Sequence, residues 1–374
     1  MPAAEPPSAG SLPAADPVSP AEAASLFADL AHEKAVVLAV SGGPDSTALA
    51  VLAARWRTSL SDAPRLLAVT VDHGLRPGSA KEARAVQRLM RDLGIAHRIM
   101  AWSGEKPVTG VQAAAREARY RLLAAAARRV GARRVVTAHT RDDQAETVLI
   151  RLVCGSGLAG LAAMSSSSAL PGSSDILVVR PFLGVPKARL LATLQAAGVA
   201  FADDPSNADL RFARARYRKI MPLLAPEGLD AARLAVLARR AARADAALEA
   251  AVTAALPEVS LTHWSNSGPI ILSRAGFEGL PAEIGLRLLG RAIAARGDGG
   301  PVELGKLEGL FDAVAGQAKK VRGAGLRRTL AGALVTLTED RLTVERAPAR
   351  RSPRRSQSAG LVESSPLPQA PRLG

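Results

Sequence analysis

Short apolar runs alternate with longer amphipathic stretches along the first half of the chain. Each apolar run has the length of a buried strand, and the residues that follow it repeat at helical spacing. Strands that alternate with helices predict an α/β fold built on a doubly wound parallel sheet. We expect strands at residues 35–40, 66–71, 97–101, 134–138 and 178–182, and helices near 21–30, 47–56, 79–93, 111–130 and 187–197.

The second half of the chain predicts a smaller, mostly helical domain that ends in a β-hairpin. Residues 165–174 are rich in serine and glycine and indicate a loop. Helices are expected at 227–256, 282–296 and 304–315, followed by a hairpin of residues 329–338 and 341–344. The expected domains are a disordered lead (1–20), a catalytic domain (21–224), a helical domain with the terminal hairpin (225–346) and a disordered basic tail (347–374).

Polar clusters follow three of the predicted strands at the point where each strand ends. They begin after Val40, Val71 and Ala138. In open parallel sheets, ligands bind beyond the carboxyl ends of the strands. The three loops are therefore expected to line one crevice.

The first cluster, Ser41-Gly42-Gly43-Pro44-Asp45-Ser46, turns a strand into a helix. Its two glycines allow a tight bend, and the free N–H groups of the helix start suit phosphate oxygens. The lysine of the Walker motif is absent, and an acid stands in its place. A carboxylate among phosphates implies a cation, so Mg²⁺ is expected. The turn resembles the signature of the ATP pyrophosphatase (PP-loop) superfamily, whose members split ATP between the α and β phosphates.

The third cluster carries two acids on one helix face, Asp143 and Glu146. Together with Asp45 they could hold Mg²⁺ or position a nucleophile. A simpler interpretation also exists, because Thr140 and Asp143 match the spacing of a helix-capping box. Their position behind His139, at the mouth of the same crevice, favours a functional role.

Other polar residues leave two interpretations open. Arg116 and Arg119 lie on one predicted helix and could bind an anionic substrate or extend to solvent. Asp72 and His73 could contact a ribose or a base, or could belong to an ordinary turn. Cys154 is expected to be a buried structural thiol rather than a nucleophile, because no partner cysteine exists.

The net charge of +15 and the isoelectric point near 11.0 point to a polyanionic partner, most simply a nucleic acid. Five basic residues within positions 211–219 form a predicted positive patch. One cysteine excludes a disulfide framework within the chain. No run approaches the roughly 20 apolar residues of a membrane span, and no basic secretory n-region is seen. These features are typical of a cytoplasmic enzyme.

The order of the motifs along the chain resembles that of the bacterial tRNA(Ile)-lysidine synthetase family. The motifs that carry the resemblance are residues 41–46, 71–76, 115–120, 138–147, 155–158 and 204–207, with a weaker match at 328–332. The resemblance implies an enzyme that binds tRNA(Ile) with a CAU anticodon and uses ATP to adenylate the C2 oxygen of the wobble cytidine. The ε-amine of free L-lysine then displaces AMP, which gives lysidine.

The same resemblance implies roles for individual residues. Asp45, Asp143 and Glu146 would serve catalysis, with Asp45 and Asp143 as metal ligands. The nucleotide would contact Ser41, Gly42, Gly43, Pro44, Asp45, Ser46, Asp72 and His73, and the other substrates would contact Arg116, Arg119, His139, Arg214, Arg216 and Arg218. Thr140, Cys154 and Ala215 depart from the usual family pattern. A homodimer is one state that the sequence leaves open.

Three rival functions differ in what they require. A tRNA cytidine C2-thiolase of the same superfamily normally needs paired cysteines, which one cysteine cannot provide. A small-molecule PP-loop synthetase would not need the basic patch or the additional helical domain. A non-catalytic tRNA-binding protein would release no pyrophosphate from ATP.

Overall fold

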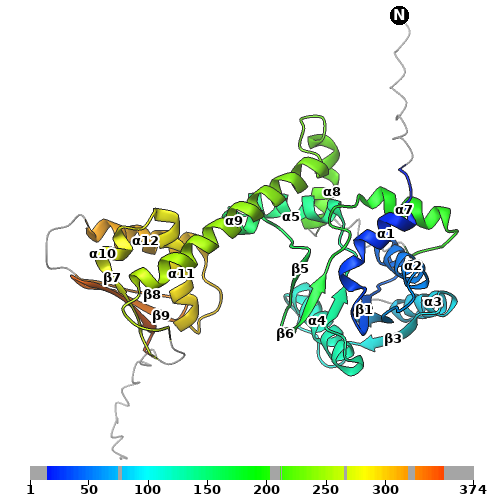
Figure 1. Ribbon diagram of the computed structural model, residues 1–374, viewed down its shortest axis with the longest axis horizontal. Helices are drawn as coiled ribbons and strands as arrows, with labels where there is room; N and C mark the ends of the chain where they lie inside the picture. Colours follow the sequence, from blue (N-terminus) through cyan, green and yellow to red (C-terminus); the bar gives the residue numbers. More distant parts are fainter. Residues whose placement is uncertain are drawn as a thin grey trace, which may run out of the picture. The chain divides into compact units, whose positions relative to one another are not determined.

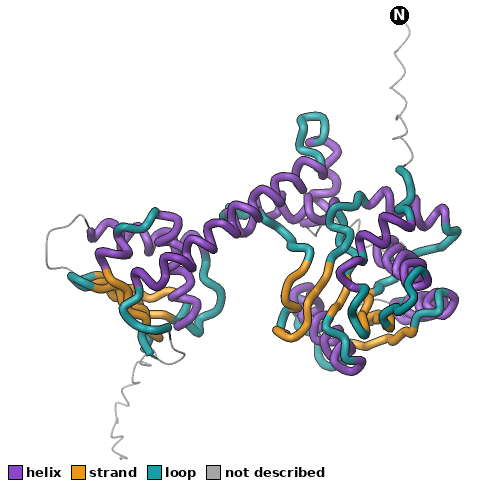
Figure 2. Tube along the Cα trace, viewed as in Figure 1, coloured by secondary structure: helices purple, strands orange, loops and turns teal. Residues whose placement is uncertain are grey.

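The computed structural model describes residues 15–74, 78–202, 211, 213–264, 268–318 and 325–348. The expectations for residues 1–14, Leu75, Arg76, the motif at 204–207 and the tail from 349 lie outside the described residues. The chain forms two compact units that divide between Leu248 and Glu249. Figure 2 shows the strands gathered into two separate sheets, one in each unit.

The first unit contains a six-stranded sheet in the order β3-β2-β1-β4-β6-β5. Five strands run parallel: β1 (Ala35–Ala39), β2 (Arg65–Asp72), β3 (Ala96–Ala101), β4 (Arg134–Val136) and β6 (Ser173–Val179). The chain builds outward from β1 to β3 and then returns to place β4 on the other side of β1. The order therefore reverses between β1 and β4, where open α/β sheets bind their ligands. The predicted fold class is confirmed.

One expectation for this sheet is wrong. Residues 165–174 are not only a loop, because β5 (Ser167–Leu170) pairs antiparallel with β6, which itself begins at Ser173. The segment carries too few apolar residues to predict a strand. An edge strand needs a partner only on one side, so backbone pairing with β6 is enough to order it.

Helices cover both faces of the sheet (Figure 1). On one face lie α1 (Pro20–Leu26), the short 3-10 helix at Ala28–Leu30, α2 (Pro44–Thr58), α3 (Ser79–Asp92) and α7 (Lys187–Ala196). The other face is covered by α4 (Val111–Val130), whose Tyr120 and Leu123 are buried against β1, β2 and β4. β1 and the middle of β2 are buried on both faces, and their sequences are accordingly almost continuously apolar.

The remaining helices of this unit pack beside the sheet. They are α5 (Arg141–Val153), α6 (Leu158–Leu161), α8 (Ala213–Leu224) and the first part of α9 (Ala231–Val259). Ala145, Val148 and Leu149 of α5 form a small core with Leu234 and Ala238 of α9. This core holds α8 and α9 against the helix that carries the acidic cluster.

The second unit has a four-stranded antiparallel sheet in the order β7-β10-β9-β8. Its strands are β7 (Ile270–Ser273), β8 (Leu326–Leu330), β9 (Ala333–Leu337) and β10 (Arg341–Arg346), and its further helices are α10 (Arg274–Glu278), α11 (Ala282–Arg296) and α12 (Leu304–Ala318). The expected single strand at 329–338 is wrong, because a turn at Ala331 and Gly332, both with positive φ, divides it into β8 and β9. None of the described helices combines the length and apolar character that crossing a bilayer requires.

Candidate active site

The loop after β1 folds around the side chain of Ser46. The Ser46 Oγ accepts hydrogen bonds from the backbone N–H of Ser41 (3.1 Å) and Gly42 (3.2 Å) and donates to the Gly43 carbonyl (3.1 Å). Gly42 has φ +92°, and a Cβ added there would lie 2.9 Å from Val86 Cγ2. The backbone therefore needs glycine at this point for both its conformation and its packing. The loop leads directly into α2, whose first turn offers N–H groups without intrahelical acceptors.

A cavity of about 440 Å³ opens where this loop meets the carboxyl ends of β2 and β4. Eleven of the predicted site residues line it. They are Ser41, Gly43, Pro44, Asp45, Ser46, His73, Arg119, His139, Asp143, Arg214 and Arg218. We call this space the phosphate-loop cavity. The three strand-end loops do converge on one crevice, as the pattern of the sequence predicts.

Asp45 occupies the first turn of α2 and has two differently placed carboxylate oxygens. Its Oδ2 accepts a hydrogen bond from Lys187 Nζ at 3.0 Å. Its Oδ1 is buried and has no hydrogen-bond partner among the described residues. Burial raises the pKa of Asp45, although the Lys187 ammonium opposes that rise. Oδ1 is therefore the one carboxylate oxygen of this residue that could accept a ligand without breaking an existing hydrogen bond.

Asp143 and Glu146 stand on the first turns of α5. Thr140 caps this helix, since its Oγ1 accepts from Asp143 N while its own N–H and hydroxyl both donate to Asp143 Oδ2. The capping box is thus confirmed, and it leaves Asp143 Oδ1 directed at the arginines of α8: Arg214 Nη1 lies at 3.6 Å and Arg218 Nη2 at 3.8 Å. Capping and function do not exclude each other here, because each uses a different oxygen.

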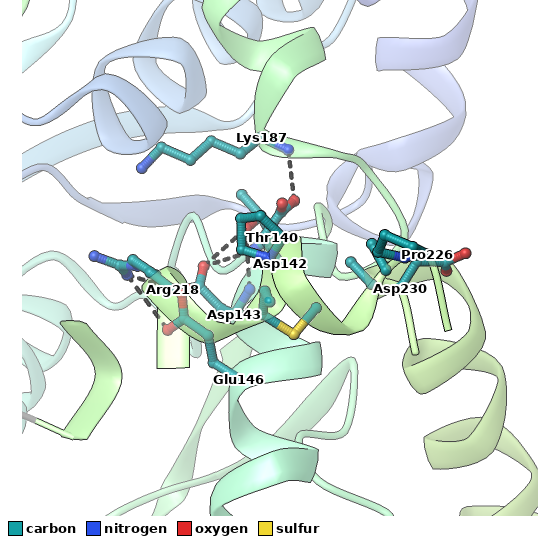
Figure 3. Close-up of a pocket in the computed structure, with 12 residues that line it drawn as sticks. Thr140, Asp142, Asp143, Glu146, Lys187, Arg218, Pro226 and Asp230 are labelled. Carbon is teal, nitrogen blue, oxygen red and sulfur yellow. Dashed lines mark hydrogen bonds and ion pairs between the residues drawn. The ribbon is translucent and has the colours of Figure 1, made fainter. Parts of the chain in front are cut away.

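Glu146 is almost fully buried, with 4% of its side chain exposed, and it accepts a 2.5 Å hydrogen bond from Arg218 Nε. Burial raises the pKa of Glu146, and Arg218 only partly offsets that effect. In Figure 3, Arg218 points toward both Asp143 and Glu146, and the dashed lines mark these contacts. The arginine thus holds the two acids together on one side of the site.

A second cavity, of about 550 Å³, lies beyond these acids (Figure 3). It is lined by the carboxylates of Asp142, Asp143, Glu146 and Asp230 and by the apolar residues Met221, Pro222, Ala225, Pro226 and Ala231. We call it the acidic cavity. Asp143, Lys187 and Arg218 line both cavities, so the two spaces meet at these three residues.

Two histidines line the phosphate-loop cavity, and burial favours the neutral form of each. His139 shares a 2.9 Å hydrogen bond between its Nδ1 and Thr137 Oγ1, and burial lowers its pKa to about 4. His73 packs edge-to-face on Trp102 with ring centroids 5.9 Å apart, and burial lowers its pKa as well. Neutral imidazoles suit contacts with a base or a ribose better than contacts with phosphate.

Some predicted site residues do not line either cavity. Gly42 allows the bend of the loop and packs against Val86. Asp72 accepts a hydrogen bond from the N–H of Gly74. Arg116 lies over the Tyr120 ring, 5.0 Å from its centroid. Arg216 is exposed and donates to the carbonyl of Arg211, so the basic patch divides: Arg214 and Arg218 turn inward and Arg216 outward.

The expectation for Cys154 is wrong. The residue is exposed at the carboxyl end of α5, and the neighbouring Leu152 and Val153 are also exposed. The apolar residues before it predict burial only if the helix face turns inward at that point. The buried face of α5 ends at Leu149 and residues 151–155 are all exposed, so the thiol meets solvent.

Lys187 is the site residue that the sequence did not reveal. It is the first residue of α7 and reaches Asp45 from 142 positions along the chain. No motif surrounds it, and only the packing of α7 on α2 brings it to the phosphate loop. Its preceding Pro186 signals a helix start but carries no hint of chemistry.

The residues present suit Mg²⁺ bound together with phosphates rather than a metal held by protein alone. No group of three or more His, Cys, Asp or Glu residues is placed to hold a metal within the part of the chain that the structure describes. Mg²⁺ commonly uses one or two carboxylates and takes its other ligands from phosphates and water. Asp45, with its unpartnered Oδ1, and Asp143 supply such a pair in one cavity.

Known proteins resemble this chain over most of its length. A model of the PP-loop domain matches residues 16–224. Proteins named tRNA(Ile)-lysidine synthase are similar over most of the chain: that of Rhodopseudomonas palustris is 56% identical, covering 89% of this chain and 96% of the relative. The protein from a Bradyrhizobium strain is 54% identical over 90% and 96%, and that from a Methylobacterium strain is 49% identical over 92% and 99%.

Among solved structures, a U34-tRNA thiolase from Methanococcus maripaludis shares the fold with a TM-score of 0.51. It is 16% identical in sequence, and the match covers 60% of this chain and 77% of the thiolase. At that identity the likeness extends to the fold alone.

Proposed function

The chain belongs to the tRNA(Ile)-lysidine synthase family, and on that premise we propose that its two adjoining cavities hold ATP and free lysine on either side of the wobble cytidine. The protein is an ATP-dependent ligase that modifies tRNA. One observation supports this assignment of the two small substrates to two cavities: the phosphate-loop cavity and the acidic cavity meet at Asp143, Lys187 and Arg218. A reaction centre at that junction would be reached by both small substrates.

ATP is assigned to the phosphate-loop cavity. The loop amides and the start of α2 would receive the phosphate oxygens. The neutral side chains of His73 and His139 are suited to the uncharged part of the nucleotide. When bound, Mg²⁺ would neutralise phosphate charge, and Asp45 and Asp143 are the residues that would hold it.

Lysine is assigned to the acidic cavity. A lysine side chain combines an aliphatic stem with a cationic end, and the cavity combines an apolar wall with four carboxylates. The stem would pack on Met221 and Pro222, and the ammonium would face Glu146 and Asp143. The raised pKa of the buried Glu146 makes it a better proton acceptor than an ordinary glutamate, so we assign it the removal of one proton from the ε-ammonium.

The chemistry then proceeds in two displacements. The C2 oxygen of cytidine attacks the α-phosphorus of ATP, the bond to the bridging oxygen breaks, and pyrophosphate leaves. The neutral ε-amine next attacks C2, and AMP departs with the former C2 oxygen. In the second step Asp143, Glu146 and Arg218 orient the amine, since they form one ion-paired cluster beside both cavities.

The finer identity of the substrates is part of this proposal. The tRNA would be tRNA(Ile) with a CAU anticodon, and the place of action would be the cytoplasm. A homodimer stays a prediction, which light scattering of the purified protein would test. The thiolase alternative is not favoured, because the only cysteine in the sequence, Cys154, lines neither cavity.

The decisive experiment is mass analysis of nucleosides from tRNA(Ile) after incubation with the protein, ATP and Mg²⁺. We expect a cytidine whose mass increases by lysine minus water, only when lysine is supplied. The Cys154→Ser variant should give the same product. A product that contains sulfur, or modification without lysine, would refute the proposal.

A further inference from the structure

Lys187 stands at the junction of the two cavities and reaches the phosphate loop from another part of the fold. Its Nζ lies 3.0 Å from Asp45 Oδ2, and the residue lines both the phosphate-loop cavity and the acidic cavity. The side chain is 37% exposed, so its ammonium is accessible to a ligand that enters from either side.

The backbone that carries this side chain is firmly anchored. The N–H of Lys187 donates to Asp142 Oδ2 at 2.8 Å, a contact that Figure 3 marks. Farther along α7, Leu190 and Leu194 are fully buried in the same core as Leu49 and Leu52 of α2. The two helices whose first turns face the phosphate site are therefore packed on each other.

The phosphate loop itself contains no cation, because residues 41–46 include no lysine or arginine. Loops of the Walker type carry a lysine that reaches the β and γ phosphates. Three other cations line the phosphate-loop cavity. Arg214 and Arg218 are directed at Asp143 and Glu146, and Arg119 is carried by α4 rather than by an element that touches Asp45. Lys187 is the cation that pairs with the loop's own acid.

We propose that Lys187 binds the β-phosphate end of ATP and then the leaving pyrophosphate, and so replaces the lysine that the phosphate loop lacks. The inference rests on the proposed placement of ATP. Asp45 would help to hold Mg²⁺ when the nucleotide is bound; its ion pair with Lys187 would then be weaker, and the ammonium would be available to the phosphate. As the bond between the α-phosphorus and the bridging oxygen breaks, the electron pair stays on pyrophosphate. Lys187 stabilises that charge.

Calorimetric binding of inorganic pyrophosphate and of AMP to the full chain, with Mg²⁺ present, tests this role without catalysis. A charge-assisted contact to phosphate is worth enough that Lys187→Gln should weaken pyrophosphate binding by about 10- to 100-fold. AMP carries only the α-phosphate, so its affinity should change by less than about two-fold. Lys187→Arg keeps the charge and should recover most of the pyrophosphate affinity.

Lys34→Gln is the matched control. Lys34 is exposed and directly precedes β1, so it lies at the amino end of that strand, whereas the cavity lies at the carboxyl ends. The affinities of this variant for pyrophosphate and for AMP should equal those of the wild type. If Lys187→Gln were poorly folded, Lys187→Met would give the same comparison with an apolar stem of similar length.

The outcomes separate the two proposals. Pyrophosphate binding that survives Lys187→Gln, or an equal loss for AMP and pyrophosphate, would overturn the role of Lys187. A purely structural ion pair with Asp45 would lower thermal stability without this selective loss. If the wild type binds pyrophosphate through Lys187 but forms no lysidine, the proposed function fails while this inference stands.

Discussion

Asp45 has two carboxylate oxygens in different surroundings. One oxygen is paired with Lys187, and the other is buried without a partner among the described residues. A buried carboxylate oxygen with no donor costs free energy unless a ligand supplies one. The arrangement is therefore understandable as that of a site prepared for a cation and phosphate.

We predict that Asp45→Asn retains the fold and lowers pyrophosphate release by about 10²–10³-fold. Asparagine has nearly the same shape but cannot hold Mg²⁺ as a carboxylate does, and loss of one preorganised electrostatic contact has effects of this size. Pyrophosphate release at saturating ATP and Mg²⁺ measures the effect, and circular dichroism checks the fold. Near-normal turnover would remove Asp45 from the mechanism.

The lowered pKa of His139 makes the stability of the folded protein depend on pH. Its pKa is about 4 in the folded protein, against 6.5 as the ordinary value. Between these two values the unfolded chain binds a proton at His139 that the folded chain does not, so stability falls as the pH drops from about 6.5 towards 4. Above pH 6.5 the residue makes no contribution to this pH dependence.

We therefore predict that the free energy of unfolding is lower at pH 5 than at pH 7, and that His139→Gln reduces this difference. The contribution of His139 should stay below about 3 kcal/mol, because the ring is partly open to the cavity. Urea unfolding of both proteins at the two pH values measures it. Identical pH dependence in wild type and variant would show that other groups cause the loss.

At the scale of the element, the two faces of α8 differ: one contacts the acids of α5 and the other is exposed to solvent. Arg214 and Arg218 are four residues apart, so they share the face that packs on α5 and meets Asp143 and Glu146. Arg216 lies between them in sequence but on the opposite face, exposed to solvent. The three arginines lie close together in sequence, but helical periodicity places Arg216 on a different face from Arg214 and Arg218.

This division predicts different effects for two matched substitutions. Arg216→Gln should weaken tRNA binding and reduce the slope of log affinity against log salt by about one, if the exposed guanidinium contacts a phosphate. Arg218→Gln should leave that slope unchanged but lower lysidine formation by about 10²-fold, because Glu146 and Asp143 lose the partner that holds them. Binding titrations at several salt concentrations and single-turnover assays measure the two effects. Equal slopes for Arg216→Gln and the wild type would mean that this face of α8 does not contact RNA.

At the scale of the whole molecule, charge and architecture serve different tasks. The sheet places three loops at the carboxyl ends of its strands, and these loops line the candidate active site. The net charge of +15 acts over the surface and attracts a polyanion without selecting a position on it. The long helix α9 (Ala231–Val259) carries the chain from the first unit into the second.

We predict that tRNA binding is strongly salt-dependent while ATP use is not. A protein that makes 6–10 phosphate contacts loses about 10³–10⁵-fold in affinity between 50 and 200 mM salt. The KM for ATP, measured at saturating tRNA, should change by less than about ten-fold because its contacts lie inside a cavity. A tRNA affinity that hardly changes with salt would show that the basic surface is not the tRNA-binding surface.

The sequence by itself determined the α/β class, most helices of the first unit and the three loops that form the crevice. Those features depend on local periodicity and on a rule about strand ends, both of which can be seen in neighbouring residues. The PP-loop turn, with Asp45 at the start of its helix, was recognisable for the same reason. The start of α5 was also predictable, because Thr140 and Asp143 cap it within one turn.

Only the tertiary structure decided which side chains meet. Lys187 reaches Asp45 across 142 residues because α7 packs on α2, and no local signal encodes that contact. The inward turn of Arg214 and Arg218 depends on how α8 packs on α5, and the pairing of β5 depends on the free edge of β6. Cys154 is exposed despite the apolar residues before it, because burial depends on how the end of a helix packs on its neighbours. In each case the deciding interaction joins segments that are distant in sequence, and its geometry exists only once the core has formed.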